Sequence, residues 1–164
     1  MKKISLFCLA LSCIGLQSCK NNQEEKAETP AETPSELAVQ KLVSSECYQA
    51  IYEQDTLMLK LNTLESGEIT GDMTMTIENM PTKQGNLAGE FKGDTLYASY
   101  TFIQGDYKEK TYKNPMAFLK KGDQLILGNG EIQTTMGASY FVKGKPIDFE
   151  RVKYKFDKVA CVTK

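Results

Sequence analysis

The chain has 164 residues with 20 basic and 21 acidic side chains, and its formal net charge of -1 offers nucleic acid no overall attraction. It contains no histidine, which excludes Ser-His-Asp and Cys-His catalysis, histidine-based zinc motifs and a charge switch near neutral pH. We therefore expect a protein that is not an enzyme, with no catalytic residue, metal, cofactor or nucleic-acid partner.

The first residues are typical of a secretory signal. Lys2 and Lys3 precede an apolar run over residues 4–16, and a basic start followed by such a run is the signal pattern. The run is shorter than the roughly 20 apolar residues that a spanning helix needs. The pattern predicts a signal peptide over residues 1–18, cut after the small residue Ser18.

The segment Leu16-Gln17-Ser18-Cys19 resembles the lipobox of bacterial lipoproteins, with a large aliphatic residue three positions before the cysteine. The resemblance implies that the Cys19 sulfur takes a diacylglycerol and that Cys19 becomes the acylated, for example palmitoylated, first residue. The whole chain is similar to short Bacteroidota lipoproteins of unknown function, which implies anchoring in the outer membrane, on its periplasmic or its surface face. The alternative is an ordinary secretory peptide or a membrane anchor that happens to contain cysteines.

A polar segment follows the predicted lipidation site. It repeats Ala-Glu-Thr-Pro at residues 27–30 and 31–34 and has few apolar residues to bury, a composition that stays disordered. We assign residues 19–44 to the lipidated cysteine and a flexible tether, with a short helix or a packed loop over residues 35–43 as open alternatives. Residues 45–164 are assigned to one β domain.

The domain sequence alternates between apolar and polar residues with a period of two, which indicates half-buried antiparallel strands. Turn signals rich in glycine, asparagine and aspartate separate the runs, among them residues 83–86. We expect strands at residues 56–64, 69–78, 87–92, 95–103, 110–119, 124–128, 137–142 and 151–156. About eight short strands predict an all-β fold, an antiparallel meander barrel that resembles lipocalin-like lipoprotein domains, or alternatively a sandwich.

Cysteine counting predicts one disulfide. Cys8 and Cys13 lie in the signal peptide and Cys19 is assigned to lipid, which leaves Cys47 and Cys161. An even remainder in an oxidising compartment is most simply a disulfide, and two separate buried thiols are the alternative. A bridge would place the first and last strands side by side.

The candidate ligand site consists of apolar residues expected to face the barrel interior: Met73, Met75, Phe91, Tyr100 and Phe102. An interior of about eight strands is either filled by its own side chains or admits one small molecule. We expect a domain that binds a small apolar ligand or lipid. The alternative is a protein- or glycan-binding envelope module, similar to small lysozyme-inhibitor lipoproteins. The methionines could also bind Cu(I), but without histidine or a Cys-x-x-Cys motif we favour their interpretation as core-filling residues.

Charge is unevenly distributed along the domain. Residues 47–104 carry 3 basic and 8 acidic side chains, whereas residues 105–164 carry 12 and 7. In the last expected strand Arg151, Lys153 and Lys155 share a face, which could dock an anionic partner. Alternatively, if Cys47 lies directly opposite Cys161, antiparallel pairing sets Glu53 against Lys155 and Asp55 against Lys153, and we favour this internal pairing.

Overall fold

The structure is a computed structural model that describes residues 41–136 and 138–161. The predicted signal peptide, Cys19 and most of the tether lie outside the described residues. No helix in the described part of the chain is long and apolar enough to cross a membrane. The strands are β1 (Leu42–Tyr52), β2 (Asp55–Leu64), β3 (Ile69–Thr76), β4 (Lys83–Lys92), β5 (Thr95–Gln104), β6 (Tyr107–Lys121), β7 (Gln124–Leu127), β8 (Ile132–Thr135), β9 (Ala138–Phe141) and β10 (Lys155–Val159).

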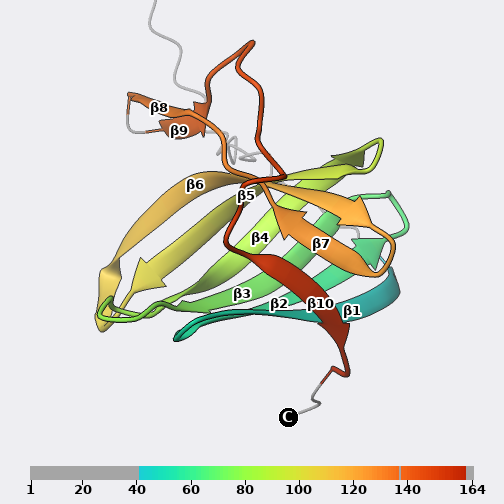
Figure 1. Cartoon of the computed structure of the whole chain (residues 1–164), viewed down its shortest axis with the longest axis horizontal. Helices are drawn as coiled ribbons and strands as arrows, with labels where there is room; N and C mark the ends of the chain where they lie inside the picture. Colours follow the sequence, from blue (N-terminus) through green and yellow to red (C-terminus); the bar gives the residue numbers. More distant parts are fainter. Residues whose placement is uncertain (1–40, 137, 162–164) are drawn as a thin grey trace, which may run out of the picture. The chain divides into compact units, whose positions relative to one another are not determined.

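Eight of these strands form a closed antiparallel barrel in the order β1-β10-β7-β6-β5-β4-β3-β2 (Figure 1). Each of β1 to β7 pairs with its neighbour in sequence, and β10 returns to close the barrel between β7 and β1. β8 and β9 form a separate hairpin that extends from the barrel beside β6. The predicted all-β, eight-stranded meander barrel is confirmed.

The core follows from the period of two, because alternate residues of a strand face opposite sides of a sheet. In β2 the inward residues Leu57, Leu59 and Leu61 are at most 5% exposed, whereas Met58 between them is 40% exposed. The buried side chains of the barrel strands form one cluster that occupies the interior. Its largest members are Tyr48, Tyr100, Phe118, Phe156, Leu57, Leu59, Met73, Leu87, Leu96 and Leu125.

Four differences from the sequence predictions affect the fold or the site, beyond shifts of a few residues at other strand ends. β1 begins at Leu42, inside the segment assigned to the tether, and so excludes a helix at its first residues. Residues 83–86, predicted as a turn, are the first residues of β4. The strand predicted at residues 137–142 is β9, which pairs with the unpredicted β8 outside the barrel. The strand predicted at residues 151–156 begins only at Lys155, because the segment before it bends at the end of the barrel.

The closing strand β10 is short and makes few ladder pairs with its two neighbours. It pairs with β1 at three positions, from Cys47↔Val159 to Gln49↔Asp157, and with β7 at two. The predicted disulfide between Cys47 and Cys161 is present, with a Cα–Cα distance of 5.1 Å. Because Cys47 lies opposite Val159 and not Cys161, the register differs by two residues from the one we expected.

Candidate functional site

The residues predicted to hold an apolar ligand mostly come together, but they fill the interior themselves. Met73, Met75, Tyr100 and Phe102 are between 1% and 8% exposed and belong to the core cluster. The Tyr100 ring stacks on Phe102 with centroids 4.8 Å apart, and its hydroxyl donates a hydrogen bond to the Met73 carbonyl at 2.9 Å. Burial raises the pKa of Tyr100. These contacts are those of a packed core.

Phe91 does not join this group. It has the same strand parity as Leu87, as predicted, but it is 36% exposed whereas Leu87 is 1% exposed. Phe91 lies one residue before the end of β4, and its side chain stays partly exposed although its cross-strand partner Leu96 is fully buried. The prediction that Phe91 lines the interior with the other four residues is wrong.

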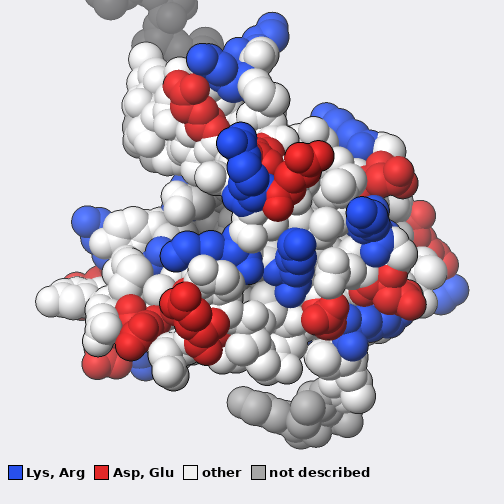
Figure 2. Space-filling model, in the orientation of Figure 1, with Lys and Arg blue, Asp and Glu red and all other residues white. Residues whose placement is uncertain are grey.

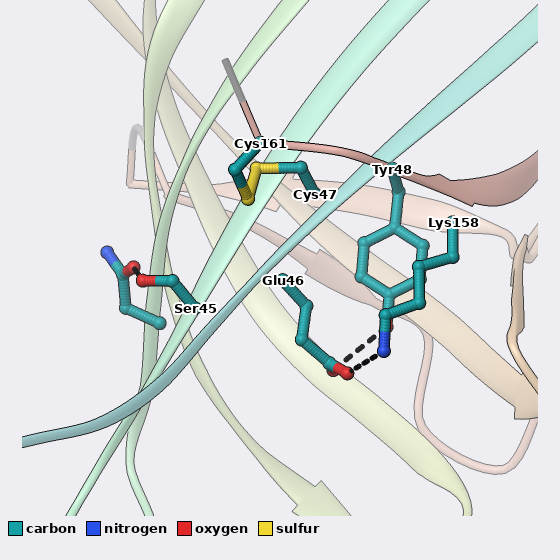
Figure 3. The surroundings of a disulfide bond; sticks show 7 residues. Ser45, Glu46, Cys47, Tyr48, Lys158 and Cys161 are labelled. Carbon is teal, nitrogen blue, oxygen red and sulfur yellow. Dashed lines mark hydrogen bonds and ion pairs between the residues drawn. A yellow bond between two sulfur atoms is a disulfide. The ribbon is translucent and has the colours of Figure 1, made fainter. Parts of the chain in front are cut away.

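A charged cluster lies next to the disulfide and ties β10 to β1 (Figure 3). Glu46 accepts hydrogen bonds from the Lys158 ammonium and from the Tyr48 hydroxyl. The Lys158 hydrogen bond lowers the pKa of Glu46, and the same contact raises the pKa of Lys158. Burial, followed by the hydrogen bond to Glu46, raises the pKa of Tyr48. Each polar group is paired with another, so we assign this cluster to barrel closure.

A second network fixes the segment that leads into β10. The buried Asp55 carboxylate accepts a hydrogen bond from the Tyr154 hydroxyl at 2.6 Å and one from the backbone N–H of Glu78 at 2.9 Å. These bonds, the one from Tyr154 first, lower the pKa of Asp55. Burial, and then the bond to Asp55, raise the pKa of Tyr154 to about 12. The network joins three parts of the chain at one end of the barrel.

The predicted basic stripe is divided among different partners. Arg151 pairs with Asp148 at 2.8 Å, and the Lys153 ammonium lies 5.3 Å from the centre of the Tyr52 ring. The predicted cross-strand partners do not pair, because the β1–β10 ladder ends at Gln49↔Asp157. Basic and acidic side chains are interspersed on the face shown in Figure 2. The structure therefore supports neither the expected pairing nor a single basic stripe.

A polar groove lies on the outer face of the barrel, where β3, β4, β5 and β6 follow one another. Its volume is about 540 Å³. We call it the polar groove, and its side chains come from these four strands: Asp72, Thr74, Gln84, Asn86, Thr101, Ile103, Lys108 and Thr111.

Strand pairing arranges the polar groove in two rows. Asp72 lies opposite Asn86, and Asn86 lies opposite Thr101. Thr74, Gln84 and Ile103 form the second row in the same way. Neighbouring strands are about 4.8 Å apart, so the first row presents three polar side chains at regular intervals across the sheet, and the second presents two polar side chains followed by the apolar Ile103.

Gly85, between the two rows, is required by the close approach of β4 to β5. A Cβ atom at this position would lie 2.0 Å from the Thr101 carbonyl oxygen and 2.5 Å from the Phe102 Cα. A missing side chain inside a strand often marks such an approach. The glycine thus allows the β4 and β5 members of each row to lie close together.

The polar groove has unused hydrogen-bonding capacity and little net charge. Asn86 donates to the Asp72 carboxylate at 2.9 Å, which orients both groups. Among the described side chains, Thr74, Gln84, Thr101 and Thr111 have no hydrogen-bond partner. The charges of Asp72 and Lys108 offset each other. Hydroxyl and amide groups both donate and accept hydrogen bonds, so the polar groove suits a ligand that does the same.

Sequence reasoning missed this site for two reasons. The composition of residues 83–86 predicts a turn, although Gln84 and Asn86 lie in β4. The alternation predicts the outward residues of β3 and β5 only as the polar side of half-buried strands. The available signal was their composition, because Thr74, Ser99 and Thr101 are uncharged where a solvated strand face commonly carries Lys or Glu.

The described part of the chain contains no group of three His, Cys, Asp or Glu residues that could hold a metal ion.

Comparisons of the chain with protein-family models, with curated proteins and with solved structures found no match. The function must therefore be inferred from the site itself.

Proposed function

We propose that this protein is an exported, non-enzymatic binding module, anchored in the outer membrane through acylated Cys19, that holds an uncharged glycan chain in the polar groove. The observation that carries the proposal is the pair of cross-strand rows of outward side chains, most of them polar and without a hydrogen-bond partner among the described side chains. Sugar hydroxyls donate and accept hydrogen bonds as these groups do. Faces of other β-barrels bind oligosaccharides in this manner.

The chemistry of the polar groove favours a glycan over other ligands. An extended peptide adds to an exposed sheet edge, but β3, β4, β5 and β6 are all paired on both sides in the closed barrel. Protein interfaces depend on a few large aromatic or arginine anchors, whereas the one aromatic residue beside the polar groove, Phe102, is 5% exposed. An anionic ligand would meet Asp72.

The interior is a less favourable place for a ligand. The four predicted residues that do face inward are packed against one another, and a ligand would have to displace them. Opening such a core forfeits its packing energy. The polar groove, by contrast, is open. It lies toward the turn at Gly105, at the opposite end of the strands from Leu42, where the chain enters the barrel, so a tether would leave it accessible.

Calorimetric titration of the full chain carrying Cys19→Ala tests this proposal. The probes are linear hexasaccharides of N-acetylglucosamine and of glucose, with hexagalacturonate as the acidic counterpart. We expect at least one neutral hexasaccharide to bind, and Asn86→Ala and Gln84→Ala to weaken it about tenfold each, as the loss of one or two hydrogen bonds predicts. Gln49→Ala, on the outer face of β1, is the matched control and should have no effect.

Two results would overturn the proposal. Absence of binding to both neutral hexasaccharides would remove the glycan ligand. Binding of hexagalacturonate alone would show that the site selects charge, which the near-neutral polar groove does not predict.

A further inference from the structure

A second groove lies further along the same outer face. β4 and β5 continue from the polar groove through Ala88↔Ser99 to Glu90↔Tyr97. There a groove of about 270 Å³ lies between these strands, β6 and the hairpin strand β9. We call it the aromatic groove, and its outward residues are Ala88, Tyr97, Ser99, Pro115, Tyr140 and Phe141.

Two tyrosines from different parts of the fold line the aromatic groove. Tyr97 belongs to β5 and Tyr140 to β9, and each is 40% exposed. The hairpin contacts the barrel through β6 and β9, and at its base the Phe141 ring packs against Gly130. Figure 1 shows the hairpin extending beside β6. An otherwise unexplained appendage of the barrel therefore supplies one wall of this groove.

The distance between the two grooves sets the length that a ligand needs to contact both of them. Gln84 of the polar groove and Glu90, which is paired with Tyr97, are six residues apart on one strand. At about 3.3 Å per residue this separation is about 20 Å. The row of Ala88 and Ser99 between them carries small side chains, which leave the path along β4 and β5 unobstructed.

We infer that the aromatic groove is a second subsite for the same glycan chain, which stacks the apolar face of a sugar ring on Tyr97 and Tyr140. This inference rests on the proposed function of the polar groove. A sugar has C–H faces and hydroxyl edges, and a tyrosine ring offers an apolar face with a polar tip. The ligand is thus a linear, uncharged oligosaccharide that extends over about 20 Å.

The test combines ligand length with ring removal. N-acetylglucosamine and glucose oligomers of two, four and six units are titrated into the full chain carrying Cys19→Ala. The backgrounds are wild type, Tyr97→Ala, Tyr140→Ala and the conservative Tyr97→Phe. We expect the hexamer to bind at least about tenfold more tightly than the dimer, because only the hexamer reaches the second subsite.

Removal of a stacked ring should weaken hexamer binding about fivefold or more. Tyr97→Phe keeps the ring and should retain binding. The dimer, held in the polar groove, should lose affinity with Asn86→Ala but not with Tyr97→Ala.

The outcomes separate this inference from the function on which it rests. If Asn86→Ala weakens binding while Tyr97→Ala, Tyr140→Ala and ligand length have no effect, the second subsite is refuted and the polar groove stands. If no oligomer binds, the proposed function itself fails. If sedimentation shows that two copies of the protein associate and that Tyr97→Ala dissociates them, the aromatic groove is an interface between copies of the protein, and the inference is again refuted.

Discussion

Removal of the disulfide should cost this domain much of its stability. The bridge joins residues 114 positions apart. In the chain-entropy model, a loop of this length corresponds to about 5 kcal/mol of stabilisation at 25 °C. Cys47 lies on the outer face of β1 and Cys161 is exposed, so their replacement creates no cavity in the core. The loss should therefore come from the greater freedom of the unfolded chain.

Urea unfolding of the oxidised chain and of the Cys47→Ser/Cys161→Ser variant measures this difference. With an m-value of about 2 kcal/mol/M for a small domain, the midpoint should fall by about 2 M or more. Gln49→Ala, on the same outer face, should leave it unchanged. In the variant, amide hydrogens of β10 should exchange faster than those of β2 to β5, because β10 has few ladder pairs. A loss below about 1 kcal/mol would refute the loop-entropy reasoning.

Four further predictions follow from the packing, the polar network and the lipobox. Leu57→Ala, at a fully buried position, should destabilise the domain by about 2 to 5 kcal/mol, while Met58→Ala, at its 40% exposed neighbour, should cost under about 0.5 kcal/mol by the same urea measurement. Gly85→Ala should lower the midpoint by forcing β4 away from β5, whereas Ala88→Ser on the open face should not; equal midpoints for the two would contradict the close approach. Tyr154→Phe should destabilise the domain at pH 7, and the difference from wild type should shrink toward pH 2. The hydrogen bond from Tyr154 lowers the pKa of Asp55 in the folded protein, and this stabilises the fold at any pH above the unfolded pKa of about 3.9. The stabilisation is lost as the pH falls through the folded pKa of Asp55. A difference that does not depend on pH would count against the bond between Tyr154 and Asp55. Cys19→Ala should release the protein from the membrane fraction, because stable anchoring needs acyl chains, and persistence in that fraction after a high-salt wash would contradict lipidation at Cys19.

The barrel could be predicted from sequence because its strands alternate strictly. Leu57, Leu59 and Leu61 have polar or exposed residues between them, and a half-buried strand requires this pattern. The disulfide could be predicted from the count of cysteines. The register could not, because two cysteines can bridge diagonal positions as well as opposite ones, and Cys47 lies opposite Val159.

The candidate site was harder to predict because it depends on outward residues, which the hydrophobic pattern does not order. Gln84 and Asn86 lie next to Gly85, and polar residues around a glycine usually indicate a turn. The aromatic groove could not be predicted, because β9 lies outside the barrel and places Tyr140 beside the outer face of β5. No local sequence signal indicates this long-range arrangement. Phe91 illustrates the converse, because correct parity does not guarantee burial at the end of a strand.

Nuclear magnetic resonance of the full chain carrying Cys19→Ala, with labelled amides and methionine methyls, tests most directly whether the ligand binds outside the barrel. The chain is titrated with the N-acetylglucosamine and glucose hexasaccharides. We expect shifts at the amides of Gln84, Asn86 and Thr101, with the methyl signals of the buried Met73 and Met75 unchanged. Shifts centred on Met73 and Met75, or no shift with either hexasaccharide, would contradict this expectation.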